Sequence, residues 1–342
     1  MRMLFFICLS IFIIIFTLAS CSTKSTEYKV TIVENTFNSS KVKGVYVKNN
    51  KKIRFRSLYS NSDNDLFFSF FINDSIYARY DFSKDSLRLE ELPLSLKLSE
   101  KGGLSYINDE YLYINENDNI IKIGANQKVD TIFKDVLSEN EFYKHSFYDD
   151  NIKVYNDSIY FQYGKTGTIS LIDSMSTMLM CNGRCERILP YPSYFFTNYI
   201  HYNGLVSTKY KDKIYYTFQT SKYIQSFSMD NGFVKTISLP YAEKYLLFNT
   251  NKNTDILYIK KYSEQTAFNY RLFCLNNRVV LLTRNTSGKK KNFKFLVYDS
   301  DLNFLGESIL NEHIPPYNIT SDNEKIIILD IYEGKIYNLF FN

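Results

Sequence analysis

The two cysteines that lie closest together in the sequence, Cys181 and Cys185, are the first candidates for chemistry. An Asn-Gly turn dipeptide lies between them and can bring the two sulfur atoms close enough to bond in an oxidising compartment. The alternative is a pair of free thiols in a loop. Zinc would need further ligands. The histidines, His145, His201 and His313, are far apart in the sequence, so we expect no metal site.

The sequence lacks the short patterns that usually mark a catalytic site. It has no G-x-S-x-G motif around a nucleophilic serine. Residues 164–167 read Gly-Lys-Thr-Gly, but the earlier glycine of a phosphate loop is missing, and we interpret them as a hairpin turn. The adjacent carboxylates at 90–91 and 149–150 would point to opposite faces of a strand. We therefore predict no catalytic residues and no cofactor.

The densest group of aromatic residues outside a clear strand follows two prolines near position 190. A loop of this kind would stack its rings on a sugar or contact a protein partner. The alternative is that the rings pack under the loop as part of the core. The candidates for ligand contact are Tyr191, Tyr194, Phe195, Phe196 and Tyr199.

The N-terminus has the layout of a secretory signal peptide. A short positive start is followed by an apolar run over residues 4–17 and then by Leu18-Ala19-Ser20-Cys21. This tetrapeptide resembles the lipobox of bacterial lipoproteins. The resemblance implies diacylglycerol on the Cys21 sulfur, cleavage before Cys21 and a mature chain that starts there. An uncleaved membrane anchor is the alternative, but the run is short for a span of about 20 residues.

These features divide the chain into a signal peptide (1–20), a tether (21–27) and a single folded domain (28–342). We expect the membrane to be a partner through the lipid on Cys21, because two or three acyl chains give stable anchoring. Ser22 follows the cysteine instead of Asp, which by analogy favours the outer membrane. The sequence leaves open whether the domain faces the periplasm or the outside.

Composition favours strands over helices. The chain has 30 Tyr and 28 Phe among its 342 residues, and aromatic side chains suit half-buried pleated surfaces. The formal net charge of +5 is mild for this length. The best basic cluster, at 289–291, fits a solvated hairpin tip better than a polyanion contact. We therefore expect no nucleic-acid partner.

A degenerate hairpin unit recurs along the chain, and its clearest copy covers Asn156–Asp173. There we expect Ile159 and Phe161 to be buried on one strand face, with the 164–167 turn exposed. A strand often precedes each unit, including one at Ile256–Lys260. Copies begin at Asn73, Asn108, Asn156, Lys211, Asn276 and Asp322.

Four strands per repeat and a period of about 50 residues are typical of β-propeller blades. We predict an all-β protein, a propeller of six four-stranded blades. The last copy lacks its outermost strand, so we expect Tyr28–Val33 to complete it and to pair the chain ends. We also predict a hairpin over Lys43–Tyr59, which is either an outer strand pair or part of a seventh blade. Two β-sandwich domains that divide near 189–192 are the other alternative.

The lipobox together with the repeated Asn-Asp-x-Ile-Tyr hairpins resembles the six-bladed propeller-like lipoproteins of uncharacterised function. The resemblance implies a fold and a location, and it carries over no active-site residues. Four Asp-Ser-apolar triplets also resemble an O-glycosylation motif used by some of these bacteria, although turn residues are the simpler interpretation. The candidate acceptors would be Ser75, Ser86, Ser158 and Ser174.

The sequence therefore predicts a lipid-anchored module of the cell envelope that binds a protein or a glycan. An envelope hydrolase or lyase that acts on glycan is the alternative, with carboxylates scattered over the tops of the blades.

Overall fold

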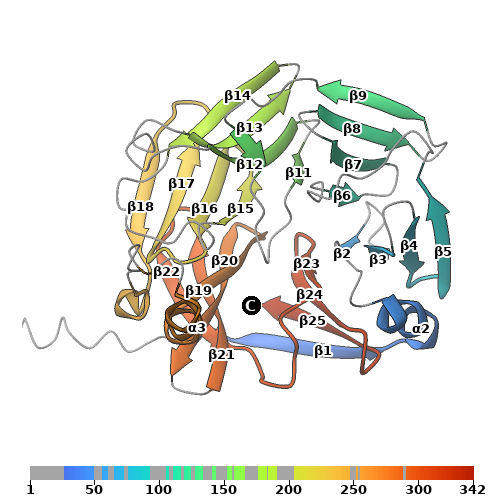
Figure 1. The fold of residues 1–342 in the computed structure, drawn as a ribbon. Helices are drawn as coiled ribbons and strands as arrows, with labels where there is room; N and C mark the ends of the chain where they lie inside the picture. Colours follow the sequence, from blue (N-terminus) through green and yellow to red (C-terminus); the bar gives the residue numbers. More distant parts are fainter. Residues whose placement is uncertain are drawn as a thin grey trace, which may run out of the picture.

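The computed structural model describes residues 27–49, 56–60, 65–72, 76–92, 105–107, 111–116, 119–124, 128–133, 141–143, 152–155, 158–165, 176–182, 184–190, 204–246, 252, 255–287 and 290–342. The described strands form six antiparallel sheets, which follow one another in chain order around the molecule (Figure 1). The prediction of an all-β protein is confirmed, and five of the six sheets have the predicted four strands.

Three sheets come from residues 56–190. Sheet 1 has the order β2 (Arg56–Ser60), β3 (Leu66–Phe71), β4 (Ile76–Asp81) and β5 (Ser86–Glu91). Sheet 2 has the order β6 (Ser105–Ile107), β7 (Tyr111–Glu116), β8 (Asn119–Gly124) and β9 (Val129–Phe133). In sheet 3, β10 (Glu141–Tyr143) and β11 (Ile152–Tyr155) both pair with β12 (Ser158–Lys165), which is followed by β13 (Ser176–Asn182) and β14 (Arg184–Pro190).

The other three sheets are more completely described. Sheet 4 has the order β15 (Leu205–Tyr210), β16 (Lys213–Phe218), β17 (Tyr223–Ser228) and β18 (Val234–Ser238). Sheet 5 has the order β19 (Phe268–Leu275), β20 (Arg278–Ser287), β21 (Lys290–Asp299) and β22 (Phe304–Ile309). Sheet 6 has the order β23 (Ile319–Ser321), β24 (Lys325–Asp330), β25 (Lys335–Phe341) and β1 (Val30–Thr36).

Sheet 6 joins the two ends of the folded chain. Strand β1 pairs antiparallel with β25, from Val30 opposite Phe341 to Thr36 opposite Lys335. The preceding residue Tyr28 donates its backbone N–H to the carbonyl of Glu307 in sheet 5, at 2.7 Å. The predicted pairing of the N-terminal strand with the last hairpin is therefore confirmed.

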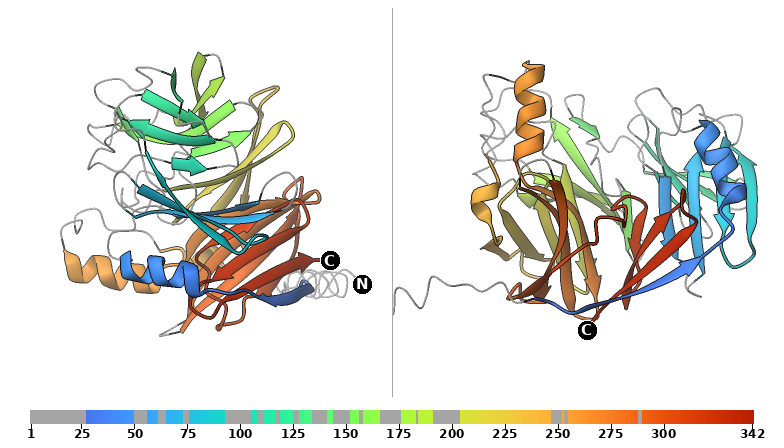
Figure 2. Two further views of the ribbon diagram at one scale, coloured as in Figure 1. Left: turned by 90° about the vertical axis from the view of Figure 1, so that its right-hand side faces the viewer. Right: turned by 90° about the horizontal axis from the view of Figure 1, so that it is seen from below.

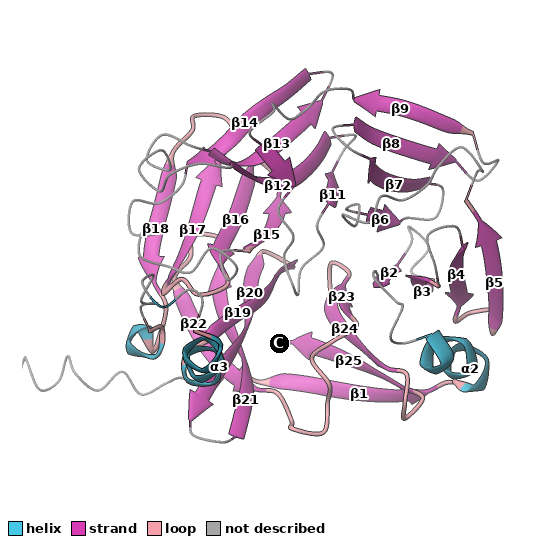
Figure 3. Ribbon diagram, in the orientation of Figure 1, coloured by secondary structure: helices cyan, strands magenta, loops and turns pink. Residues whose placement is uncertain are grey.

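Two predicted strands are instead helical. Residues Ser40–Asn49 form helix α2, so the hairpin predicted over 43–59 is wrong, and Arg56–Ser60 is the one strand among the residues described there. Residues Ile256–Gln265 form helix α3, where a strand was predicted. In Figure 3 both helices stand out against the strands, and Figure 2 shows them projecting from one face of the molecule, with the C-terminus on the opposite face.

Both helices carry local signals that explain them. The Asp255 side chain accepts a hydrogen bond from the backbone N–H of Tyr258 at 3.0 Å, which caps the first turn of α3. Tyr258 and Tyr262 are four residues apart and stack on one helix face. In α2 the buried residues Val42 and Tyr46 have the same spacing. In α2 the spacing of these two buried side chains therefore favours a helix more strongly than the β-branched residues favour a strand.

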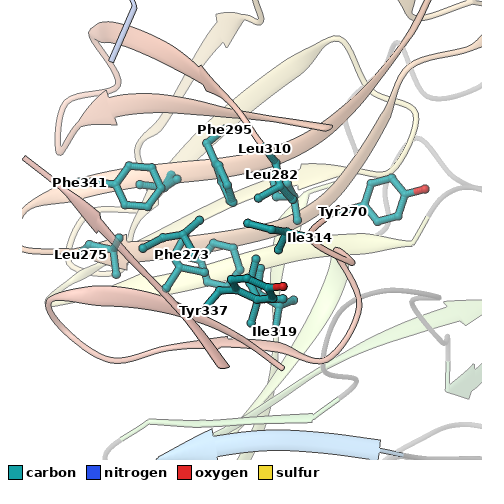
Figure 4. Packing of buried hydrophobic residues seen from close by; sticks show 14 of the residues in the cluster. Tyr270, Phe273, Leu275, Leu282, Phe295, Leu310, Ile314, Ile319, Tyr337 and Phe341 are labelled. Carbon is teal, nitrogen blue, oxygen red and sulfur yellow. The ribbon is translucent and has the colours of Figure 1, made fainter. Parts of the chain in front are cut away.

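Apolar side chains fill the junctions between consecutive sheets. Figure 4 shows the junction between sheets 5 and 6, where Phe273 and Phe295 meet Tyr337 and Phe341. Phe295 and Phe341 are in edge-to-face contact, with ring centroids 5.3 Å apart. Aromatic pairs of this kind add about 0.5–1.5 kcal/mol beyond the area that they bury. Part of the excess of Phe and Tyr in the sequence therefore packs between neighbouring sheets.

Four further junctions are made in the same way. The clusters join sheets 1 and 2 (Tyr59, Phe67, Ile121, Ile123), sheets 3 and 4 (Tyr160, Leu189, Leu205, Ile214), sheets 4 and 5 (Val206, Tyr215, Leu272, Leu281), and sheets 6 and 1 (Ile327, Leu329, Phe68, Tyr80). Between sheets 2 and 3, strand β6 contacts β11. Every sheet therefore contacts the sheet before it and the sheet after it.

The hairpin unit at Asn156–Asp173 is described only in part. Ile159 is buried, as predicted. Gly164 and Lys165 belong to β12, where they pair with Phe142 and Glu141, so these two residues are strand and not turn. The side chain of Phe161 and the rest of the predicted turn and second strand lie outside the described residues.

Candidate functional site

The predicted site residues lie largely outside the part of the chain that the structure describes. This holds for the lipidation site Cys21 and for the aromatic residues Tyr191, Tyr194, Phe195, Phe196 and Tyr199. In the described ranges no three His, Cys, Asp or Glu side chains gather closely enough to hold a metal ion.

Cys181 is buried and disulfide-bonded, and Cys185 lies directly opposite it in the pairing of β13 with β14. The bond between these two cysteines stays a prediction, since the Cys185 side chain is outside the described part of the structure. Cys274, in contrast, is half-buried and is not disulfide-bonded.

We expect reduction of the predicted Cys181–Cys185 bond to lower the free energy of unfolding by about 2 kcal/mol, the value for a loop of about five residues. Urea unfolding of the wild-type protein and of Cys181→Ala, each with and without reductant, measures this change in the free energy of unfolding. The variant should show no response to reductant, and a Cys274→Ala control should respond like the wild type. An equal response of Cys181→Ala and the wild type would rule the bond out.

Two of the serines that resemble glycosylation acceptors are inaccessible. Ser158 is only 7% exposed, and the hydroxyl of Ser86 is buried. An enzyme that attaches a sugar needs the hydroxyl at the surface, so neither serine is an acceptor in the folded protein. Ser75 and Ser174 lie outside the described residues.

A buried polar network lies where sheets 4 and 5 meet below α3. Its centre is Asn269, which has no exposed surface. The Asn269 amide donates to the carbonyls of Phe218 and Ser221, at 2.8 Å each, and to the Thr217 hydroxyl at 3.1 Å. Its Oδ1 atom accepts from the Tyr245 hydroxyl at 2.7 Å. One side chain therefore joins the β16–β17 turn to the start of β19.

The Tyr245 hydroxyl extends this network to the next strand. It lies 3.1 Å from the hydroxyl of Thr283, which donates in turn to the carbonyl of Phe268 at 2.9 Å. Burial raises the pKa of Tyr245, so its hydroxyl stays protonated and donates. The network fixes the segment that leads from α3 into the innermost strand of sheet 5.

We expect Asn269→Ala to lower the free energy of unfolding by about 2 kcal/mol, because it removes the buried hydrogen bonds to the carbonyls of Phe218 and Ser221 and the one from the Tyr245 hydroxyl. Asn292→Ala, on an exposed position of β21, is the matched control and should stay within about 0.5 kcal/mol of the wild type. Urea unfolding of both variants measures the difference. Equal stability of the two would contradict the role given to the network.

Helix α3 presents apolar side chains to solvent at its first turn. Ile256 is 78% exposed and Leu257 is 80% exposed. The helix also carries the exposed residues Lys260 and Lys261. Its last turn is held on sheet 5 by Arg284, whose Nη2 atom donates to the carbonyl of Ser263 at 2.5 Å. The helix therefore has a last turn held on sheet 5 and a first turn with two exposed apolar side chains.

No family model matches the chain, and no curated protein matches it. A solved structure of a member of the DUF4221 family from Bacteroides vulgatus has a TM-score of 0.64, with 13% identity, over 93% of this chain and 99% of that one. The two proteins share a fold. Together with the six sheets this makes the fold propeller-like.

Weaker likenesses extend to proteins of other kinds. A luciferin-regenerating enzyme has a TM-score of 0.47 at 9% identity, over 91% of this chain and 95% of its own. The extracellular domain of a putative one component system from B. thetaiotaomicron has a TM-score of 0.45 at 10% identity, over 84% of this chain and 33% of its own. These scores are too low to carry an argument about function.

Proposed function

We propose that the chain is a closed six-bladed β-propeller, anchored to a membrane through a lipid on Cys21, that serves as a binding module of the cell envelope. The observation that carries the binding role is the arrangement of the two faces. Strand β1 begins beside the end of β25, while α2 and α3 project from the opposite face (Figure 2). A tether on one side leaves the helix-bearing side free for a ligand.

Ring closure is supported by the packing of the sheets. Sheet 6 packs on sheet 1 through Ile327 and Phe68, and β1 links sheet 6 to sheet 5 through the backbone of Tyr28. A blade buries both faces only between two neighbours, so an open array would leave two apolar faces in water. Six blades follow from the six sheets, with no sheet left for a seventh among the described residues.

Anchoring by lipid is supported by the sequence of residues 18–21. Five residues lie between Cys21 and Glu27, which limits the distance from lipid to domain to about 20 Å. In the described residues no helix is long and apolar enough to span a membrane. We propose the outer membrane as the location.

We expect Cys21→Ser to move the protein from the membrane fraction to the soluble fraction, because the thioether to the lipid can no longer form. Immunoblots of fractionated cells that express the full chain measure this. Cys8→Ser, within the predicted signal peptide, is the matched control and should leave the protein on the membrane. Membrane retention of the Cys21 variant would contradict lipid anchoring.

The binding role is tested by screening the purified mature domain against a panel of envelope glycans and peptides, with product analysis on every component that binds. We expect binding without turnover. A double variant, Ile256→Ser with Leu257→Ser, should weaken binding at least tenfold. The control is Phe233→Ser, which alters a side chain that is 65% exposed in the β17–β18 turn. Turnover would support the enzyme instead, and an equal effect of control and test variants would reject the α3 face.

A further inference from the structure

Among the residues that the structure describes, one buried cation lacks a counter-charge. Arg284, in β20, is only 6% exposed. Its contacts are the hydrogen bond from Nη2 to the Ser263 carbonyl and the rings of Phe268 and Tyr270, whose centroids lie 4.7 and 6.0 Å from the guanidinium carbon. The Nε atom is buried and has no acceptor. No described carboxylate forms an ion pair with this arginine.

Burial of an ion is unfavourable unless an opposite charge and hydrogen bonds compensate for it. The Ser263 carbonyl belongs to the last turn of α3, where the helix dipole supplies about half a negative charge. A guanidinium carries five N–H donors, and one of them has an acceptor here. The guanidinium therefore has N–H donors left for further acceptors, and its positive charge is only partly compensated.

The surroundings favour an anion that is carried by an organic molecule. Phe268 and Tyr270 flank the guanidinium, and at the edge of the core cluster the Tyr270 hydroxyl points away from Leu282 and Ile314 (Figure 4). Two lysines lie further along the same hairpin. Residues 290 and 291 pair with 287 and 286 of β20, just beyond Arg284. The sequence of this hairpin therefore adds two basic residues beyond Arg284.

We propose that Arg284 is the anion subsite of the binding face and that it receives an oxyanion of the ligand, either a carboxylate or a sulfate or phosphate ester. This inference rests on the proposed binding role of the α3 face. Each of these oxyanions presents two oxygens to the fork of the guanidinium and accepts two parallel hydrogen bonds. The buried Nε–H, which has no acceptor in the protein, is the donor that the oxyanion would satisfy.

The test measures thermal unfolding of the mature domain in glucuronate, sodium sulfate or sodium phosphate, each compared with sodium chloride at the same ionic strength. We expect at least one oxyanion to raise the midpoint by about 4 °C beyond chloride, since a ligand that binds only the folded state stabilises it. Glucuronate distinguishes a sugar carboxylate from the inorganic ions. The Nε–H resonance of Arg284 in ¹⁵N-labelled protein should shift with the same oxyanion.

Arg284→Met should abolish the stabilisation by the oxyanion. Arg284→Lys keeps the charge and loses the fork, so it should bind the oxyanion at least tenfold more weakly. Arg278→Met is the matched control. Arg278 also lies in β20, over the Tyr28 ring, and donates to the carbonyl of Phe341. This variant should keep the response of the wild type.

The inference fails if no oxyanion acts beyond chloride on the wild type, or if both Arg284 variants respond as the wild type does. If the panel ligand binds wild type and Arg284→Met equally, the binding role stands and the anion subsite is rejected. If no panel ligand binds but an oxyanion stabilises the protein in a way that depends on Arg284, the anion subsite is supported. The proposed binding of the panel ligands is then rejected.

Discussion

Removal of residues 27–36 is expected to abolish cooperative unfolding of the domain. The deletion takes away β1 and all seven of its register pairs with β25, together with the link from Tyr28 to sheet 5. It also uncovers the edge of β25, and an unpaired edge promotes aggregation. The loss should exceed about 5 kcal/mol, which is the lower end of the stability of natural domains.

Far-UV circular dichroism during urea unfolding, with size-exclusion chromatography of the same samples, measures this effect. The control exchanges the partly exposed residues Ile32 and Val33 for threonine. Threonine retains the strand propensity, so we expect a change of less than about 1 kcal/mol. A truncated protein that stays monomeric and unfolds cooperatively near the wild-type midpoint would show that β1 does not close the fold.

The second large effect is expected for Lys294→Met. The Nζ atom of Lys294 lies 2.9 Å from Oε1 of Glu307, and both side chains are largely buried. The Tyr241 hydroxyl donates to the same oxygen at 3.0 Å, while Oε2 has no partner. Without the ammonium, Glu307 would be a buried carboxylate with one hydrogen bond. We expect the free energy of unfolding at pH 7 to fall by about 3 kcal/mol.

Urea unfolding of Lys294→Met and of the wild type at pH 7 measures this loss of stability. Equal free energies of unfolding for the two proteins would contradict the role given to the contact between Lys294 and Glu307.

The double variant Lys294→Met with Glu307→Gln completes a double-mutant cycle. It removes both charges, so it should be more stable at pH 7 than Lys294→Met alone. A double variant that is as unstable as the sum of the two single variants would mean that the ion pair contributes nothing.

Much of the strand framework could be predicted from residue patterns. Alternation in Tyr28–Val33 and the missing last strand of the sixth copy together predicted the β1–β25 pairing, because a period of two marks a half-buried strand. The same reasoning failed for α2 and α3. Both contain β-branched or aromatic residues at a density typical of strands, and the contrary signals were the Asp255 cap and the spacing of Tyr258 and Tyr262.

The candidate site was harder to predict, because its residues gain their roles only in the tertiary structure. Arg284 follows an apolar strand run and resembles an ordinary residue at a strand end. Its burial depends on the last turn of α3, a helix that the pattern did not reveal. Asn269 likewise acts through the β16–β17 turn, about 50 residues away in the sequence. Local patterns do not report contacts over such separations.

Hydrogen–deuterium exchange of the mature domain, with and without a bound panel ligand, tests the central claim most directly. The account predicts that exchange changes at α3 (Ile256–Gln265) and at the adjoining part of the β20–β21 hairpin, with the ligand recovered unchanged. Changes confined to the turns at 299–303 and 321–325, or conversion of the ligand into a product, would contradict a binding module that uses the α3 face.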